Sequence, residues 1–284
     1  MIISIASGKG GTGKTTVAVG LALSLDNVQF LDCDVEAPNA HIFLKPHFLK
    51  KVPGYIVVPE IDEDLCTHCG MCAEACNYNA IAVFTGKKDE DDSILHFPNL
   101  CHGCGVCGYV CGVNAIKDSK REIGVIEEGI GCGLEFIQAR LHVSEAMASP
   151  LIRQVKGLAK KDKIVIIDAP PGTSCPVINA VSGSDFCILV TEPTPFGLND
   201  FILAVKLMKA LNLPFGAVIN RCDLGDTKVD EYCIKEDIPV LMKIPFKKEI
   251  AAGYSMGTAI TEILSEHKDK FKELFFKIEG FCRK

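Results

Sequence analysis

The chain has 284 residues, of which 48% are hydrophobic, and its net charge is −6 at pH 7. This length and apolar content are sufficient for one large α/β domain or for two domains. The acidic balance argues against non-specific binding to nucleic acid, which requires a basic surface, so we expect no nucleic-acid partner.

Fifteen cysteines are a high number for this length. The first residues run directly into a glycine-rich loop without the apolar segment of a signal peptide, and no apolar run approaches the roughly 20 residues that span a bilayer. We therefore expect a cytoplasmic protein, in which structural disulfides are rare and cysteines usually serve metal or redox chemistry.

A buried strand is predicted over residues 2–6, and a phosphate-binding loop follows it. The loop matches the pattern G-x₄-G-K-[ST], whose backbone amides surround phosphates at the N-terminus of the next helix, here predicted over 17–25. Lys14 is expected to reach the β- and γ-phosphates, and Thr15 to bind Mg²⁺. The residues assigned to the nucleotide in this loop are Gly8, Lys9, Gly10, Gly11, Thr12, Gly13, Lys14, Thr15 and Thr16.

Lys9 adds a second lysine early in the loop. The loop as a whole thereby resembles the deviant Walker A motif, K-G-G-x-G-K-[ST], of the superfamily that contains ParA, MinD and the nitrogenase iron protein. The resemblance implies that ATP is the nucleotide and that two subunits close on two ATP molecules as a homodimer. It also implies a catalytic role for Lys9, which reaches across to the partner's nucleotide, and for Lys14.

An acidic segment leaves the second predicted strand, 28–31, at the carboxyl edge where ligands of open α/β sheets bind. It resembles the switch I segment of the same superfamily. The resemblance implies that Asp34 orients the attacking water and that Asp32 supports Mg²⁺ or the loop. The alternative is that both carboxylates only cap the end of the strand. Residues 41–55 have no clear pattern, and a strand is predicted over 56–59.

Two identical cysteine runs with the spacing C-x₂-C-x₂-C-x₃-C come next. This is the ligand pattern of two [4Fe–4S] clusters, in which the fourth cysteine of each run ligates the other cluster. One cluster is assigned to Cys66, Cys69, Cys72 and Cys111, and the second to Cys101, Cys104, Cys107 and Cys76. Zinc, which cysteine pairs also bind, is the alternative.

Each run is followed by Asn-Ala-Ile, so the segment is an internal duplication that resembles bacterial two-cluster ferredoxins. Asn77 and Gly112 stand where those ferredoxins have proline, a departure that concerns the local turn and not the ligation. His68 and His102 lie inside the runs and are expected to be loop residues, because the thiols already complete both sites.

A further strand over 163–167 ends in Asp168, followed by Ala-Pro-Pro-Gly. A carboxylate at the end of a buried strand can hold Mg²⁺ through water, as a Walker B aspartate does. By resemblance this segment is switch II, in which the amide of Gly172 senses the γ-phosphate. The catalytic set is therefore Lys9, Lys14, Asp34 and Asp168, and the Mg²⁺ set is Thr15, Asp32 and Asp168.

Strands are also predicted over 123–126, 186–191, 215–219 and 239–244, and helices over 151–160 and 200–211. The strand 215–219 ends in Asn220 and Arg221, and the family resemblance implies that Asn220 contacts adenine. Arg221 stands where guanine readers with the pattern N-K-x-D have lysine. Asp223 leaves GTP open, so the preference for ATP rests on the resemblance.

The C-terminal residues 268–283 have apolar positions at helical spacing with basic residues around them. Basic amphipathic helices of this kind anchor MinD proteins to membranes. A terminal helix that packs its apolar face on the sheet is more common, and we favour that reading, so membrane contact is not expected.

Two cysteines outside the runs fall at positions similar in order to those that hold a cluster between the subunits of the nitrogenase iron protein. Cys132 lies in Gly-Ile-Gly-Cys-Gly, and Cys175 follows Asp168 by seven residues. The hypothesis is a further intersubunit cluster on Cys132 and Cys175 of two subunits. The alternative is a pair of ordinary small apolar residues.

The predicted fold class is therefore α/β: a mostly parallel P-loop sheet with helices on both faces, plus a small inserted bacterial-ferredoxin-like α+β lobe. The ATPase domain would comprise residues 1–59 and 120–284, and the inserted two-cluster domain 60–119. By resemblance the protein is an ATPase that couples nucleotide state to electron transfer toward a client metalloprotein. An iron–sulfur cluster carrier of the Mrp type is the alternative, and a MinD-like positioning ATPase is a weaker one.

Overall fold

The computed structural model describes residues 1–86 and 92–282, and the chain forms two compact units. The first unit comprises Met1–Val52, Ile126–Arg140 and Ile152–Lys284, and the second comprises Pro53–Val125 and Leu141–Leu151. The second unit contains the predicted insert 60–119 but extends beyond it at both ends, and it takes a further segment from later in the chain.

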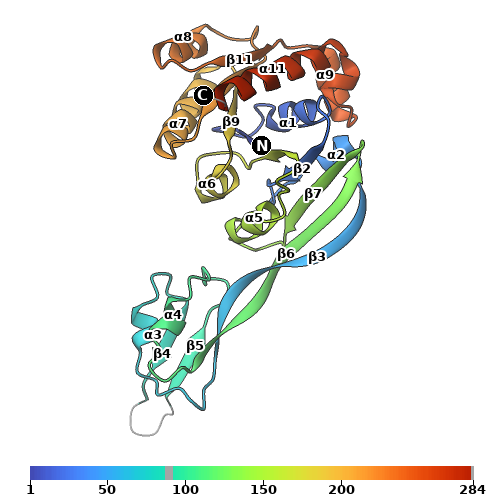
Figure 1. The fold of residues 1–284 in the computed structure, drawn as a ribbon. Helices are drawn as coiled ribbons and strands as arrows, with labels where there is room; N and C mark the ends of the chain where they lie inside the picture. The colour runs from blue at the N-terminus through green and yellow to red at the C-terminus, as the bar shows by residue number, and fades with distance from the viewer. Residues whose placement is uncertain (87–91, 283–284) are drawn as a thin grey trace. The chain divides into compact units, whose positions relative to one another are not determined.

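Within the described residues, nine strands form one sheet in the order β11-β10-β9-β1-β8-β2-β7-β6-β3 (Figure 1). The pairs of β1 with β8 and β9, of β2 with β7 and β8, and of β10 with β9 and β11 are parallel. The prediction of a mostly parallel sheet is therefore confirmed. The bounds are β1 Ile2–Ala6, β2 Val28–Asp32, β3 His47–Ile61, β6 Ile116–Gly131, β7 Leu134–Leu141, β8 Ile164–Asp168, β9 Phe186–Thr191, β10 Phe215–Asn220 and β11 Val240–Ile244.

The central strands are buried on both faces, as their continuous apolar runs predict for a parallel sheet. Ile3, Ile166 and Ile188 contribute to one large hydrophobic cluster, whereas their buried neighbours Val165 and Leu189 alternate to the opposite face. Strand β1 lies between β8 and β9, so the strand order changes direction beside it. Ligands of open α/β sheets bind at such a switch point.

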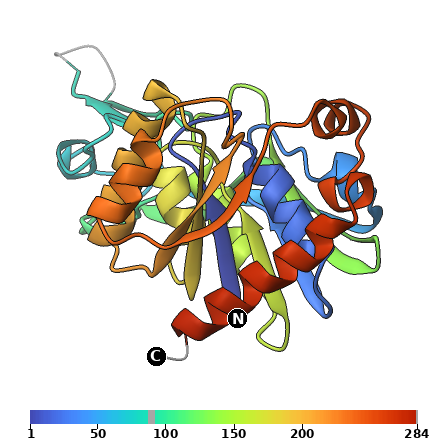
Figure 2. The same cartoon turned by 90° about the horizontal axis from the view of Figure 1, so that it is seen from above.

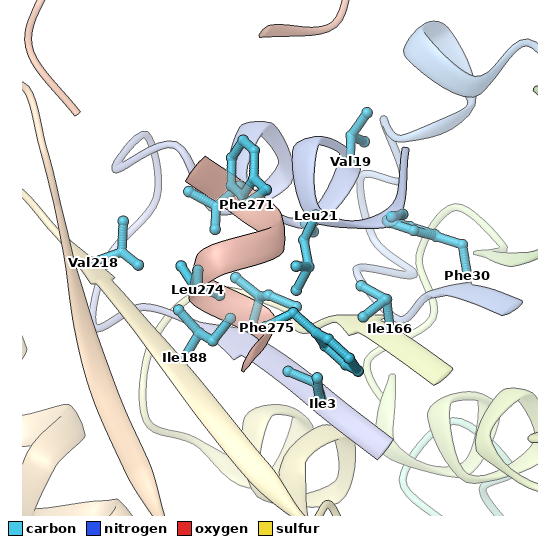
Figure 3. Close-up of a cluster of buried hydrophobic side chains, with 14 of the residues drawn as sticks. Ile3, Val19, Leu21, Phe30, Ile166, Ile188, Val218, Phe271, Leu274 and Phe275 are labelled. Carbon is cyan, nitrogen blue, oxygen red and sulfur yellow. The ribbon is translucent and has the colours of Figure 1, made fainter. Parts of the chain in front are cut away.

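Helices α1 (Lys14–Ala22) and α11 (Glu266–Cys282) lie against each other over the sheet (Figure 2). Phe271, Leu274 and Phe275 of α11 enter the hydrophobic cluster together with Leu21 of α1 (Figure 3). The expectation that the C-terminal helix packs its apolar face on the core is thus confirmed. Within the part of the chain that the structure describes, no helix has the length and apolar character needed to cross a membrane.

The remaining helices outside the cysteine runs connect strands of the large sheet or follow its last strand. They are α2 His41–Leu44, α5 Ser149–Lys156, α6 Cys175–Val181, α7 Pro195–Ala210, α8 Lys228–Lys235, α9 Lys248–Ser255 and α10 Ile260–Ile263. All of them except the start of α5 lie in the first unit. The start of α7 shows how the sequence fixes these boundaries, because Thr194 Oγ1 accepts a hydrogen bond from the amide of Gly197 at 3.0 Å and Pro195 occupies the first helical position.

The second unit holds the cysteine runs. Strands β4 (Ile81–Phe84) and β5 (Ser93–His96) pair antiparallel, and the short helices α3 (Met71–Glu74) and α4 (Val106–Tyr109) each begin inside a run. Gly70 and Gly105 precede these helices with φ of 80° and 74°. The two runs therefore share their local backbone as well as their spacing, as an internal duplication predicts.

Candidate nucleotide and cysteine sites

A cavity of about 380 Å³ lies at the phosphate-binding loop. The loop residues Gly10–Thr16, apart from Thr12, line it together with Asp34, Asn39, Pro171, Asn220 and Arg221, which follow other strands. Its far wall is the segment 245–254. This size lies within the about 300–1,000 Å³ of small-molecule sites. The residues predicted to bind the nucleotide, all but Gly8, Lys9 and Thr12, therefore converge on one cavity at the carboxyl edge of the sheet.

The turn into α1 depends on Gly13. This residue has φ of 94°, and a Cβ there would lie 2.4 Å from Nδ2 of Asn220. Asn220 donates in turn from Nδ2 to the carbonyl of Thr12 at 2.9 Å. The loop and the end of β10 are thus in direct contact. The Lys14 residue directly after this turn is almost fully buried, with 7% exposed.

Thr15 and Asp168 meet as the Mg²⁺ prediction requires. Thr15 Oγ1 donates to Asp168 Oδ2 at 2.6 Å, and Asp168 Oδ1 is buried without a hydrogen-bond partner in the described residues. Burial raises the pKa of the Asp168 carboxyl, while Lys14 and the bond from Thr15 oppose that change. A buried carboxylate oxygen without a partner, beside a threonine hydroxyl, fits an oxygen-seeking cation such as Mg²⁺.

Asp32 lies beside Asp168 in the β2–β8 register and is fully buried. Its carboxylate accepts hydrogen bonds from three backbone amides of the following loop, those of Asp34 at 3.1 Å, Asn39 at 3.2 Å and Ala40 at 3.1 Å. Burial, reinforced by Asp168, raises the pKa of Asp32 well above its usual value. Of the two predicted roles, support of the loop is the one that these contacts serve.

Asp34 reaches the cavity from that loop. Burial raises the pKa of its carboxyl to about 6, with the charge of Lys14 acting in the opposite direction. Asp34 therefore changes protonation closer to neutral pH than an ordinary aspartate does, and its ionised form is the one that could orient water.

Lys9, by contrast, does not line the cavity but forms an ion pair within its own chain. Its Nζ lies 2.6 Å from Oε1 of Glu192, and Nη1 of Arg221 lies 3.0 Å from Oε2 of the same carboxylate. Glu192 was not predicted as a site residue, because a glutamate after a strand has no distinctive pattern.

The segment 245–254 was also missed. Asp223 Oδ1 accepts the amide of Phe246 at 2.6 Å and so fixes the start of this wall. Tyr254 lines the cavity and packs on Phe43 of α2, with ring centroids 4.9 Å apart. Its position after the last parallel strand was the only available signal, since that edge of the sheet carries the ligand.

In the second unit, the eight cysteines of the runs gather around two cavities. One is lined by Cys66, Cys69, Cys72 and Cys111. The other is lined by Cys76, Cys101, Cys104 and Cys107. Each cavity therefore takes three cysteines from one run and the fourth from the other, which is the crossed grouping that the spacing predicts. His68 and His102 line one cavity each.

Backbone amides point at the same sulfurs in both runs. The amides of Ala80 and Ala115 donate to Sγ of Cys76 and Cys111, each at 3.3 Å. The amides of His68 and Gly103 make the equivalent bonds to the first cysteine of each run, each at 3.5 Å. None of the fifteen cysteines, all of which lie in the described residues, forms a disulfide. In the described residues, no three or more His, Cys, Asp or Glu side chains form a group that could hold a metal ion.

Cys132 and Cys175 are not brought together. Cys132 has φ of 50° in the turn before β7, and Cys175 is the first residue of α6 after β8. Because β7 and β8 both run parallel to β2, one cysteine lies toward the amino edge of the sheet and the other beyond the carboxyl edge. A cluster shared by both pairs would need the two cysteines of each subunit to be neighbours, and this placement does not favour the hypothesis.

Known proteins resemble the chain along most of its length. A protein of unassigned function from Methanocaldococcus jannaschii is 34% identical over 99% of this chain and 97% of its own. The iron-sulfur cluster carrier protein of Rickettsia bellii is 25% identical over 93% of this chain and 67% of its own. The septum site-determining protein MinD of Pyrococcus horikoshii, solved with Mg-ADP, superposes with a TM-score of 0.57 at 20% identity, over 99% and 96% of the two chains.

The similarity to the MinD structure supports the fold, and the match to a sequence-family model shows to which family the chain belongs. The model for the CobQ/CobB/MinD/ParA nucleotide binding domain matches residues 3–260, which include the phosphate-binding loop, Asp34, Asp168 and the end of β10. The chain is therefore a member of the CobQ/CobB/MinD/ParA family of nucleotide-binding proteins.

Proposed function

We propose that this protein binds and hydrolyses ATP, carries two [4Fe–4S] clusters, and couples its nucleotide state to electron transfer toward a client metalloprotein. The observation that carries the proposal is the crossed sorting of the eight run cysteines into two four-cysteine cavities, in a chain that also has a phosphate-binding loop. The cysteine cavities alone would support only a redox role, and the phosphate-binding loop alone only a nucleotide-binding role.

The nucleotide step is assigned to residues around the larger cavity. Lys14 would bind the β- and γ-phosphates, and Thr15 with Asp168 would hold Mg²⁺, for which the unpartnered Asp168 Oδ1 is available. Asp34 would orient the attacking water from the facing loop. Asp223 already accepts the Phe246 amide with one oxygen, which supports ATP over a guanine nucleotide that would need this carboxylate.

The cysteine cavities fit the ligation of [4Fe–4S] clusters, each of which binds one thiolate per iron and supplies one-electron transfer when present. This requirement differs from that of a single ion, because the four sulfurs surround a cluster and need not converge on one point. The amides that point at the sulfurs of Cys76 and Cys111 would stabilise thiolate charge. The chain's contribution is thus the ligand sets and their hydrogen bonds.

Coupling between the two functions would follow the chain itself. The loop that carries Asp34 leads into α2, and α2 leads into β3, which runs from the first unit into the second. Phe43 of α2 packs on Tyr254 at the cavity wall. A nucleotide that moves the loop or Tyr254 therefore acts on the segment that enters the cysteine unit.

Paired Cys→Ser substitutions test the crossed ligand sets. The double variant Cys72→Ser, Cys76→Ser changes two cysteines of the same run that line different cavities. We expect it to abolish both clusters. Cys76→Ser with Cys104→Ser removes two ligands of one cavity, and about four of about eight iron atoms per chain should remain. If each run held its own cluster, the two results would be exchanged. Iron and sulfide analysis after anaerobic reconstitution measures this, with Cys282→Ser as a control outside the runs, and zinc without iron would refute the clusters.

A cluster carrier is the second candidate, because relatives from Rickettsia and Pyrococcus are named iron-sulfur cluster carrier proteins. Incubation of the reduced, cluster-loaded protein and ATP with a client separates the two functions. Transfer of iron to a cluster-free client without oxidation supports the carrier. Oxidation by a cluster-loaded client with all iron retained supports electron transfer, and absence of any ATP dependence would contradict both.

A further inference from the structure

Glu192 is the centre of a charged cluster beside the phosphate-binding loop. It accepts Lys9 Nζ on one carboxylate oxygen at 2.6 Å and Arg221 Nη1 on the other at 3.0 Å. The Glu192 side chain is only 12% exposed. Since most of the carboxylate is withdrawn from water, its attraction for both cations is screened less than it would be at an open surface.

The backbone of both cations is held in place. Ser7 Oγ donates to the carbonyl of Lys9 at 2.6 Å, and Ser7 is almost fully buried. The amide of Arg221 donates to Asn220 Oδ1 at 3.0 Å, and Asn220 is bonded to the loop through Thr12. The Lys9 side chain is therefore the part of this cluster that can change partners without a change in the loop backbone.

We propose that Glu192 is a positioning residue that retains Lys9 on its own subunit until an ATP-bound partner subunit offers a stronger anion. The inference rests on the proposed ATPase function and on the homodimer that the family resemblance implies, in which Lys9 contacts the nucleotide of the partner. A triphosphate carries more negative charge than one carboxylate, so it can draw Lys9 away. Arg221 stays with Glu192 after the exchange, so the carboxylate is not left without a counter-charge. Closure of the dimer is thereby tied to the nucleotide that the partner holds.

Glu192→Gln tests this exchange, because it removes the charge and keeps the size of the side chain. Even a fully exposed pair changes an equilibrium by about 1.5- to 5-fold, and a dimer releases two pairs. The dimer dissociation constant should therefore fall by at least about 2-fold, and by about 25-fold at the upper value. Sedimentation velocity with Mg²⁺ and a non-hydrolysable ATP analogue measures the constant. Glu236→Gln is the matched control, since it removes the exposed 2.8 Å pair with Lys209 at the surface.

A second measurement uses the nucleotide-free protein. The rate at which an amine-acylating reagent modifies Lys9, read by mass spectrometry, should rise severalfold in Glu192→Gln and stay constant at Lys206. Glu192→Asp serves if the first variant does not fold, because its shorter side chain reaches Lys9 less well and keeps a charge for Arg221. An unchanged rate at Lys9, or an unchanged or weaker dimer, overturns the proposal. A wild-type protein that forms no ATP-dependent dimer instead refutes the dimeric function on which it rests.

Discussion

Helix α1 packs closely against Phe271 of α11 at Gly20, which leads to a prediction about the stability of the core. A Cβ at position 20 would lie 2.4 Å from Cε2 and 2.6 Å from Cζ of Phe271, whose side chain is fully buried. Overpacking of this kind costs about 1–3 kcal/mol, whereas Gly→Ala within a helix contributes about 1 kcal/mol of stability. Gly20→Ala should therefore destabilise the protein by up to about 2 kcal/mol.

Removal of the ring reverses that result. Phe271→Ala alone should cost about 3–5 kcal/mol, because it empties a fully buried aromatic position. In its background, Gly20→Ala no longer meets the ring and should stabilise the protein by up to about 1 kcal/mol. The two substitutions are thus expected to be coupled by about 1–3 kcal/mol.

Urea unfolding followed by far-UV circular dichroism measures the free energies, with hydrogen exchange of the α1 amides as a local probe. Phe276→Ala is the matched control, because this neighbour on α11 is 65% exposed and should change stability by less than about 0.5 kcal/mol. An equal effect of Gly20→Ala in both backgrounds would refute the described contact. So would a cost of Phe271→Ala no larger than that of Phe276→Ala, which would mean that α11 is not held on the core.

Three further predictions concern the nucleotide cavity. The kcat/KM for ATP should fall as the pH drops through about 6, because burial raises the pKa of Asp34 to about 6 and a protonated carboxyl cannot orient water; a pH–rate profile that is flat there would contradict this role. Asp168→Asn should raise the Tm of the nucleotide-free protein, because the pKa of Asp168 is raised in the folded state and its charged form therefore opposes folding increasingly as the pH rises. The same substitution should abolish the further increase in Tm that Mg·ATP produces in the wild-type protein. Calorimetry measures both effects. Asp223→Ala should leave the ratio of ATP to GTP affinity, measured by titration calorimetry, unchanged. It should lower the free energy of unfolding by about 1 kcal/mol, because the Asp223 carboxylate accepts a hydrogen bond from the Phe246 amide. A shift of the ratio toward ATP would mean that Asp223 recognises guanine.

The central strands could be predicted from the sequence, but the edge of the sheet could not. Strands β1, β8 and β9 are buried on both faces, so their apolar runs are a direct signal. The first half of β3 is largely exposed, and Pro53-Gly54 inside it is typical of a turn. Pairing with β6 rather than burial therefore determines this strand, and a single sequence does not show which segments pair.

The same distinction applies to the candidate site. The loop that ends in Lys14 and Thr15 was recognisable because its chemistry lies in consecutive residues, and the cysteine runs were recognisable for the same reason. The partner of Lys9 is 183 residues away, and the wall around Phe246 and Tyr254 has no pattern of its own. Such residues are defined by the folded sheet, which places the ends of distant strands at one edge.

In the proposed coupling, the nucleotide would act on the cysteine unit through the connecting chain, which requires no contact between the two units. The Asp32 carboxylate accepts hydrogen bonds from the backbone amides of Asp34, Asn39 and Ala40 in the loop, and α2 begins directly after this loop. Only this short helix separates the loop from the start of β3, so a change in the loop would act on that strand, which continues into the second unit. A strand paired with β6 transmits such a displacement better than a flexible linker would, because its backbone hydrogen bonds resist local bending. The proposed control of the cysteine unit by the nucleotide therefore has a continuous strand to act through, as it would not if a flexible linker joined the two units.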